Sequence, residues 1–199
     1  MIETELKAVV PDLAGTRRRA EQHGARLTFE GRLEDRRYDR PDLSLAAVDH
    51  VLRLRVYRDG TSLVSASVDW KGPSSLTGTY KEREEITSAV SGDPTQLGNI
   101  LERLGFIITM QIDREIWQYE LRDAIVRFER YPRMDDLVEV EGAPGAIEDA
   151  ISMLGLPRDS FTTQRLPDFV REYEARTGIS AALSDAELHG EVRYDVSNA

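Results

Sequence analysis

Short segments in which apolar and charged residues alternate recur along this chain, and they constrain its fold more than any other feature. Apolar side chains at every second position are typical of strands that bury one face. About eight segments have this character: residues 2–8, 26–38, 51–56, 64–70, 80–89, 116–119, 126–128 and 138–140. Eight strands are enough to close a barrel, so we expect an antiparallel sheet that closes on itself.

Four segments with helical start and stop signals interrupt or follow these strands. Asp12 and Asp93 are expected to cap the first two helices, and Gly105 to end the second, in which Leu97, Ile100, Leu101 and Leu104 share one face. Two further helices are expected at residues 144–154 and 168–176. The predicted fold class is therefore α+β, an eight-stranded antiparallel closed β-barrel with helices packed outside. Residues 1–178 would form this domain, and residues 179–199 a C-terminal tail or cap.

Composition excludes several kinds of site and partner. The 199 residues include no cysteine, which rules out disulfides, thiolate zinc sites and cysteine nucleophiles. The net charge of −10 disfavours a broad surface for a nucleic-acid polymer. No apolar run approaches the ~20 residues that span a bilayer, so we expect no membrane association and a cytoplasmic protein. The sequence allows a homodimer, and it contains no phosphate-binding loop, dinucleotide fingerprint or nucleophile elbow.

The charged faces of the predicted strands carry both signs. Their acids are Glu3, Glu5, Glu85, Glu129, Glu139 and Glu141, and their bases are Lys7, Arg53, Arg55, Lys71, Arg83, Arg114 and Arg127. In an ordinary half-buried sheet such faces point to water. However, the carboxylates of Glu3 and Glu5, and those of Glu139 and Glu141, would repel each other unless cations or a metal offset them. If the barrel encloses these faces, its interior suits a triphosphate together with a hard divalent cation.

The segment Glu3-Thr4-Glu5-Leu6-Lys7 resembles the Glu-x-Glu-x-Lys opening of the CYTH superfamily, the triphosphate tunnel metalloenzymes. This superfamily includes class IV adenylyl cyclases, thiamine triphosphatases and inorganic triphosphatases. Later segments follow in the family's order, and the resemblance spans about residues 1–175. These segments are Leu52-Arg53-Leu54-Arg55, Asp69-Trp70-Lys71-Gly72-Pro73, Arg83-Glu84-Glu85, Leu104-Gly105-Phe106, Arg114 and Glu139-Val140-Glu141.

The resemblance implies an eight-stranded tunnel and a role for each matching residue. It implies that Mg²⁺ or Mn²⁺ would bind Glu3, Glu5, Glu139 and Glu141. It also implies that Lys7, Arg53, Arg55, Lys71, Arg83 and Arg114 would hold the triphosphate, and Arg127 shares the charged face with them. The expected catalytic residues are Glu3, Glu5, Lys7, Glu85 and Glu129, with Glu85 orienting basic side chains.

The sequence departs from the family pattern at three positions. Ile112 stands where a basic residue is common, Glu129 replaces an aspartate, and Asp135 replaces a glycine. The loss of one cation weakens phosphate binding, and the longer Glu129 side chain can displace a metal or a contact to the nucleophile.

Three functions remain open on the sequence alone. The first is conversion of ATP to cyclic AMP and pyrophosphate, as in the class IV adenylyl cyclase branch, which Lys71-Gly72-Pro73 and Leu104-Gly105-Phe106 favour. The second is hydrolysis of tripolyphosphate, thiamine triphosphate or a nucleoside triphosphate. The third, suggested by Ile112 and Glu129, is a module that binds a triphosphate or polyphosphate without turnover. These three functions stay open because fold alone does not fix function. The expected partner in each case is a small-molecule triphosphate.

Overall fold

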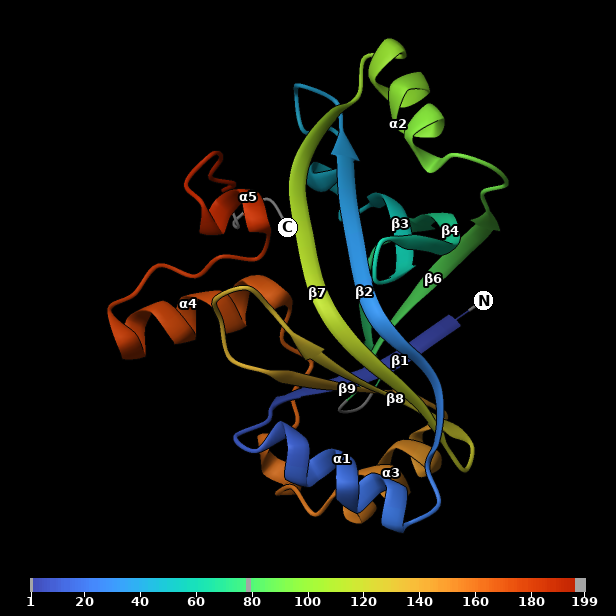
Figure 1. Cartoon of the computed structure of the whole chain (residues 1–199), viewed down its shortest axis with the longest axis vertical. Helices are drawn as coiled ribbons and strands as arrows, with labels where there is room; N and C mark the ends of the chain where they lie inside the picture. Colours follow the sequence, from blue (N-terminus) through green and yellow to red (C-terminus); the bar gives the residue numbers. More distant parts are fainter. Residues whose placement is uncertain (1, 78–79, 196–199) are drawn as a thin grey trace.

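The computed structural model describes residues 2–77 and 80–195, although the side chains of residues 2, 3 and 77 lie outside that description. In the described residues nine strands form one antiparallel sheet in the order β1-β9-β8-β7-β2-β3-β4-β6-β5. Pairing of β1 with β6 closes eight of these strands into a barrel, while β5 pairs with β6 outside it. The predicted fold class is therefore confirmed (Figure 1).

The eight barrel strands follow one another along the chain as the alternation predicts, with one strand longer than expected, while the short strand β5 is unexpected. The strand β7 begins at Ile107 rather than near residue 116, and it pairs with β2 over most of its length. The strands are β1 (Ile2–Val9), β2 (Arg26–Asp39), β3 (Val51–Asp59), β4 (Ser62–Lys71), β5 (Ser75–Thr77), β6 (Tyr80–Ala89), β7 (Ile107–Leu121), β8 (Ala124–Arg130) and β9 (Leu137–Gly142). The helices are α1 (Leu13–Gln22), α2 (Pro94–Arg103), α3 (Pro144–Leu154), α4 (Leu166–Thr177) and α5 (Asp185–Leu188), with short 3₁₀ turns η1 (Ala46–Val48) and η2 (Arg158–Ser160).

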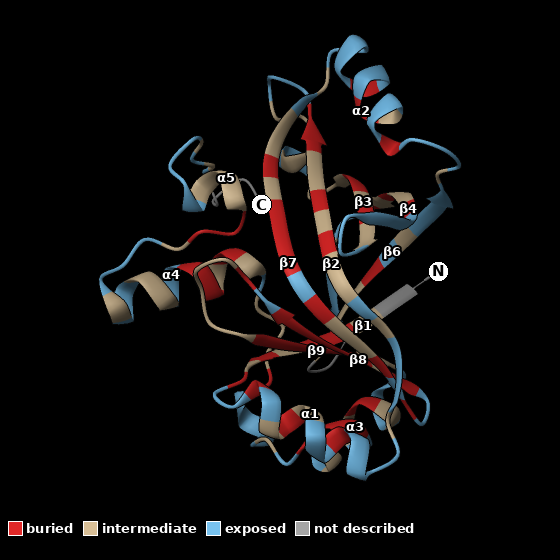
Figure 2. Cartoon of the chain, viewed as in Figure 1, coloured by how far each residue is buried: buried red, intermediate tan, exposed pale blue. Residues whose placement is uncertain are grey.

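Helices α1 and α3 pack side by side against the outer faces of β1, β8 and β9 (Figure 1). Ile147, Ile151 and Leu154 of α3 are buried there, and each contributes about 1.5–3 kcal/mol by leaving water. Figure 2 shows the same arrangement, with buried residues along β7, β8 and β9 and on the barrel-facing sides of these helices. The apolar cluster under α1 and α3 therefore lies outside the barrel, while most side chains that line the interior are polar.

Helix α2 lies at the opposite end of the barrel from α1 and α3 (Figure 1). Leu101 packs with Tyr38 and Leu54, but Ile100 and Leu104 are 54% and 70% exposed. The apolar side of α2 is therefore only partly covered, because the helix contacts mainly β3.

The segment after α4 packs against the barrel. Ala182, Leu183 and Ser184 are buried, and the backbone N–H of Asp113 in β7 donates to the Leu183 carbonyl at 2.8 Å.

Helix α4 itself begins two residues before the expected start, because Asp168 accepts a hydrogen bond from the backbone N–H of Arg165. The division into a domain at 1–178 and a tail stays a prediction. Within the described ranges, none of the helices has the length and apolar run that crossing a bilayer requires.

Candidate functional site

The inner face of the barrel lines a cavity of about 410 Å³, which we call the tunnel. Its described lining includes ten Lys or Arg and six Asp or Glu. Basic residues outnumber acidic ones in this lining, although the chain as a whole has a net charge of −10, and Asp69 and Glu85 outside the lining also form ion pairs with lining cations. The basic lining residues are Lys7, Arg37, Arg53, Arg55, Lys71, Lys81, Arg83, Arg114, Arg127 and Arg165, and the acidic ones are Glu5, Asp35, Asp42, Asp49, Glu129 and Glu139.

The strand register interleaves acids and bases on the inner wall. Glu5 of β1 lies between Lys81 of β6 and Glu141 of β9, its directly opposed neighbours on the two sides. One step along β1, Lys7 opposes Glu139, which in turn opposes Arg127 of β8. Because directly opposed residues of an antiparallel pair share a face, these six side chains belong to one surface.

Lys7 is the centre of the contacts on this surface. Its ammonium group lies 2.8 Å from a carboxylate oxygen of Glu5 and 2.8 Å from one of Glu139. Burial alone would lower the pKa of Lys7, but the Glu139 and Glu5 carboxylates raise it above its usual value. Burial would likewise raise the pKa of Glu139, yet Lys7 and Arg127 hold that pKa well below the usual range. The repulsion expected between carboxylates is thus offset by cations of the chain itself.

Lys81 is a second ammonium group in contact with Glu5. Its Nζ donates to Oε1 of Glu5 at 2.5 Å. Burial lowers the pKa of Lys81, the Glu5 carboxylate raises it, and the neighbouring Lys7 lowers it again, so that the pKa falls below its usual value. Glu5 therefore binds two lysines at once, one from its own strand and one from β6.

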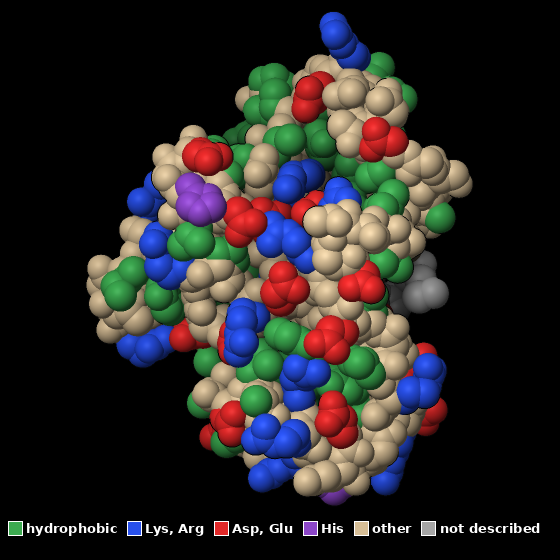
Figure 3. Space-filling view, in the orientation of Figure 1, with side chains coloured by type: hydrophobic (Ala, Val, Ile, Leu, Met, Phe, Trp, Pro, Cys, Tyr) green, Lys and Arg blue, Asp and Glu red, His purple; other side chains and the backbone are tan. Residues whose placement is uncertain are grey.

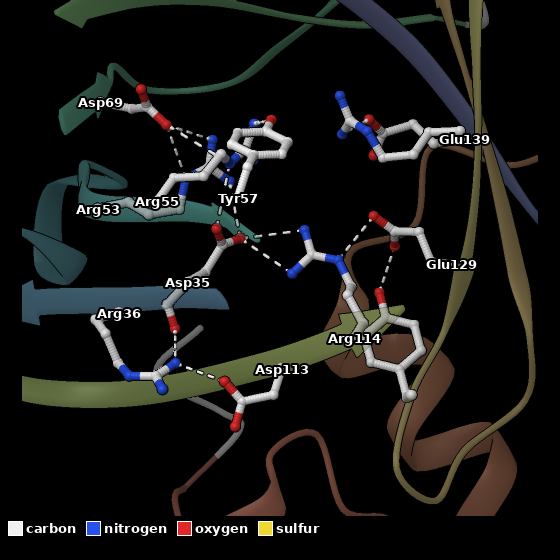
Figure 4. Close-up of polar contacts among 12 residues, drawn as sticks. Asp35, Arg36, Arg53, Arg55, Tyr57, Asp69, Asp113, Arg114, Glu129 and Glu139 are labelled. Carbon is white, nitrogen blue, oxygen red and sulfur yellow. Dashed lines mark hydrogen bonds and ion pairs between the residues drawn. The ribbon is translucent and has the colours of Figure 1, made fainter. Parts of the chain in front are cut away.

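A second network joins β2, β3, β4, β7 and β8 across the tunnel (Figure 4). Asp35, only 1% exposed, accepts two hydrogen bonds from Arg114 at 3.1 Å and one from Arg55 at 3.2 Å. Asp69 accepts two from Arg53, at 3.0 and 3.1 Å. Burial would raise the pKa of Asp35, but the guanidinium groups of Arg114, Arg55 and Arg53 hold it far below its usual range. These two aspartates fix the orientation of the arginines.

The remaining predicted cations are also held in place. Lys71 lies 2.8 Å from a carboxylate oxygen of Glu85, its directly opposed neighbour on β6. Arg83 donates to the backbone carbonyl groups of Gly72 and Asp49. The expected contact of Glu85 with a basic side chain is present, because its carboxylate meets Lys71.

The structure shows which residues bind the side chains at two of the three positions that depart from the family pattern, Glu129 and Asp135. Glu129 is buried, accepts from Arg114 at 2.9 Å and from the Tyr131 hydroxyl, and so anchors this arginine. Burial and the Glu129 charge raise the pKa of Tyr131 well above its usual value, which keeps its hydroxyl a donor. Asp135 lies outside the tunnel lining, where it binds Arg176 of α4.

One mouth of the tunnel is bounded by the segment between β2 and β3 and by the start of α4. Leu43, Ala46 and Val51 line the first side, and Leu166 and Pro167 the second. Arg165 connects the two sides, since it lies 2.9 Å from Asp49 and also donates to the Ser74 hydroxyl. This mouth therefore combines an apolar rim with an ion pair.

The structure places most of the predicted site residues on the tunnel wall. Glu5, Glu129 and Glu139 line it together with all seven predicted cations. Glu85 reaches it through Lys71, and Glu141 occupies the register position beside Glu5. For Glu3, the backbone opposes Arg83, while its side chain lies outside the described residues.

Sequence reasoning missed Asp35, Arg37, Asp69, Lys81 and Arg165 as site residues. Asp69 and Lys81 did carry a signal, because the first shares a strand face with Lys71 and the second is one of only three lysines in the chain. Asp35 and Arg37 lie in a run of four consecutive charged residues, 34–37, so that alternation does not identify their side of the sheet.

Carboxylates in the tunnel supply the donors for a hard cation, although lysines are bound to them here. Among the described residues, no group of three or more acidic or histidine side chains is arranged to hold a metal ion. Lys7 and Lys81 bind Glu5, and Lys7 also binds Glu139. Since Glu5, Glu139 and Glu141 lie on two adjacent strands and carboxylate oxygen is the ligand that Mg²⁺ and Mn²⁺ prefer, the donor set fits such an ion once these lysines move away.

Several solved structures share this fold at low sequence identity. A protein of Pyrococcus horikoshii is 21% identical, with a TM-score of 0.68 over 84% of this chain and 98% of its own. A candidate adenylate cyclase of Vibrio parahaemolyticus is 14% identical, with a TM-score of 0.73 over 86% of this chain and 98% of its own. A candidate adenylyl cyclase of Hippeastrum, described as having a dominant triphosphatase activity, is 16% identical, with a TM-score of 0.59 over 92% of this chain and 99% of its own.

No curated protein sequence matches the chain. The model of the CYTH domain does match, over residues 1–149, which covers β1 to β9 and the first half of α3. The closed barrel with its charged interior and the order of the matching segments agree with this match. The chain therefore belongs to the CYTH domain family.

Proposed function

We propose that this chain is a divalent-metal-dependent enzyme that acts on a triphosphate bound in the tunnel. The observation that carries the proposal is the set of ten Lys and Arg side chains that line the tunnel of an otherwise acidic protein. Lys and Arg side chains bind the negatively charged oxygens of a phosphate chain. On the face shown in Figure 3, in contrast, basic and acidic side chains are interspersed.

The cations that we assign to triphosphate binding come from seven positions around the wall. Arginine suits this task because its planar guanidinium group can donate two hydrogen bonds to one phosphate. Asp35 and Asp69 hold Arg53, Arg55 and Arg114 in fixed orientations before substrate binds. The assigned residues are Lys7, Arg53, Arg55, Lys71, Arg83, Arg114 and Arg127.

The carboxylates that we assign to a metal lie on β1 and β9. Superfamily members act with a divalent ion, and we assign its ligands to Glu3, Glu5, Glu139 and Glu141. When bound, Mg²⁺ or Mn²⁺ neutralises charge on the phosphate chain and on the attacking oxygen. Lys7 and Lys81, released from these carboxylates, would turn toward phosphate oxygens, which keeps both lysines paired.

The favoured reaction is of the class IV adenylyl cyclase type. The ribose 3′-oxygen of ATP would attack the α-phosphorus, the bond from that phosphorus to the bridging oxygen would break and pyrophosphate would leave, while the 3′-hydroxyl proton passes to water. Support comes from the apolar rim of Leu43, Ala46, Val51, Leu166 and Pro167 at the mouth, which suits a nucleoside base. In this reaction Glu85 would position Lys71, and Glu129 would position Arg114.

Hydrolysis of a terminal phosphate is the second candidate. It needs the same cations and metal ligands with water as the attacking group, and the activity described for the Hippeastrum relative favours it. A module that binds without turnover is the third candidate, favoured by the lysines that bind Glu5 and Glu139. The predictions of a cytoplasmic location, of no nucleic-acid or membrane partner, and of a possible homodimer remain predictions.

A substrate panel separates these candidates. Purified protein is incubated with ATP, thiamine triphosphate or tripolyphosphate, each with Mg²⁺, with Mn²⁺ or with a chelator, and products are resolved by chromatography. Cyclic AMP and pyrophosphate from ATP are expected, and release of inorganic phosphate instead would establish the hydrolase. The variant Arg114→Met is the matched negative control. Tight tripolyphosphate binding without any product would establish the binding module, and absence of both binding and turnover would refute the proposal.

A further inference from the structure

Arg37 is a tunnel cation that neither the strand alternation nor the family resemblance identifies. It lies on β2, where its directly opposed neighbours are Arg53 of β3 and Met110 of β7. Its side chain is half-buried and lines the same cavity as the seven predicted cations. Arg37 thus stands on the tunnel wall beside another arginine.

Among the described side chains, the neighbouring arginines have carboxylate partners and Arg37 does not. Arg53 is bound by Asp69, and Arg114 by both Asp35 and Glu129. No carboxylate of the described side chains, which do not include that of Glu3, forms an ion pair with Arg37, and its buried Nε atom has no hydrogen-bond partner among them. A buried donor without a partner destabilises the folded chain by leaving a polar group desolvated.

The charges around Arg37 also leave its guanidinium group without full compensation. Burial and the Arg53 charge lower the pKa of Arg37 to about 10, and the opposing effect of Asp35 is only partial, since Arg114 and Arg83 also lower it. Two like charges at directly opposed strand positions are unfavourable unless an anion lies between them. The position therefore holds more positive charge than the chain itself neutralises.

The stretch of β7 beside Arg37 presents apolar side chains to the tunnel, so a cation for an anion there has to come from the neighbouring strand β2. Its inward positions there are Met110, opposite Arg37, and Ile112, opposite Asp35. Both side chains are apolar and buried, so this stretch of β7 contributes no donor to an anion in the tunnel. Arg37 on the next strand can reach the same part of the cavity, whose lining also includes Ile112.

We propose that Arg37 is a further anion-binding residue of the tunnel, and that its guanidinium group donates to a phosphate oxygen of the bound triphosphate. The bound anion satisfies the Nε donor and separates the charges of Arg37 and Arg53. The identity of the anion rests on the proposed function, whereas the unpaired cation is a property of the described structure itself.

The test compares Arg37→Gln with Arg40→Gln, which removes the same charge three residues along at an exposed position outside the tunnel lining. Affinity for tripolyphosphate is measured by titration calorimetry without metal, and melting temperature is measured with and without the anion. Arg37→Gln should weaken binding about ten- to hundredfold, as expected for one charge-assisted hydrogen bond. It should also leave the melting temperature of the free protein unchanged or higher, while Arg40→Gln binds within about twofold of wild type.

The outcomes separate this inference from the proposed enzyme. Weaker binding by Arg37→Gln without turnover in any variant supports the inference and contradicts the enzyme. Equal affinity of wild type and Arg37→Gln overturns the inference whatever the turnover, and so does a lower melting temperature of the free variant, because that result assigns Arg37 a structural role. Arg37→Lys, which keeps the charge but loses the planar fork, should bind with intermediate affinity. No binding of tripolyphosphate to wild type would contradict both.

Discussion

Replacing Asp35 by Asn tests whether the tunnel arginines depend on a buried carboxylate. Asp35 is 1% exposed and accepts two hydrogen bonds from Arg114 and one from Arg55, with Arg53 at 3.6 Å. Asparagine has almost the same shape, so the substitution removes the charge without leaving a cavity. Three buried guanidinium groups then face an amide that carries no compensating charge.

The expected loss of stability follows from breaking a buried ion pair. Removing one partner of such a pair destabilises a protein by about 3–5 kcal/mol, because the opposite charge stays buried without compensation. For a chain of this length each kcal/mol lowers the melting temperature by about 2–4 °C, so Asp35→Asn should melt roughly 6–20 °C below wild type. Urea unfolding at neutral pH measures the difference in free energy, and calorimetry measures the difference in melting temperature.

The pH dependence of the folding stability should also differ between wild type and Asp35→Asn. The pKa of Asp35 is held far below its usual value in the folded chain, so its contribution is fully present above the unfolded pKa of about 4 and is lost as the pH falls through the folded pKa. Wild type should therefore lose stability on acidification below about pH 5, and Asp35→Asn should lose less over the same range.

Two further measurements complete this test. Asp59→Asn, at an exposed position at the end of β3, is the control and should unfold as wild type does. Added tripolyphosphate should restore part of the lost stability, because it supplies negative charge to the same arginines. A loss below about 1 kcal/mol, or an equal loss in the control, would show that the arginines are not held by Asp35.

Three other variants test separate parts of the site. Glu141→Gln should remove most metal-dependent turnover, followed as product formation with Mn²⁺, and unchanged turnover would exclude this residue as a ligand. Lys81→Gln should tighten Mn²⁺ binding severalfold, measured as free Mn²⁺ by electron paramagnetic resonance, because Lys81 no longer competes for Glu5. An unchanged affinity would mean that Lys81 and the metal do not share that carboxylate. Arg165→Gln should raise KM more than it changes kcat and should alter stability by less than about 1 kcal/mol, because its ion pair with Asp49 is half-exposed. A fall in kcat with KM unchanged would contradict a role confined to the mouth.

Period-two alternation predicts the barrel and the side of each strand that faces the tunnel. It succeeds for β1, β3, β8 and β9, because the outer face of each strand packs on helices or neighbouring loops while the inner face is charged. It fails for the first half of β7, where Met110, Ile112 and Asp113 are all buried. Asp113, on the outer face there, is covered by Arg36 and the segment after α4, so both faces are buried and no alternation results.

The partners of the charged residues depend on strand register, which a single sequence does not determine. Glu5 and Lys81 are 76 residues apart and meet only because β1 pairs with β6. Asp35 binds Arg114, 79 residues away, through the pairing of β2 with β7. Seven cations and several carboxylates of the tunnel could be assigned from sequence, but Asp35, Arg37, Asp69, Lys81 and Arg165 could not. That Arg37 lacks a carboxylate partner among the described side chains could be found only from the structure.

Crystals grown with tripolyphosphate and Mn²⁺ would show whether the tunnel binds a metal and a triphosphate together. The anomalous signal of manganese locates the metal independently of the phosphate density. We expect one or two manganese peaks beside Glu5, Glu139 and Glu141, with Lys7 and Lys81 turned away and phosphate oxygens bound by Arg53 and Arg114. Manganese and tripolyphosphate bound on the outer surface, with Lys7 and Lys81 still bound to Glu5 and Glu139 as in the free protein, would contradict the account.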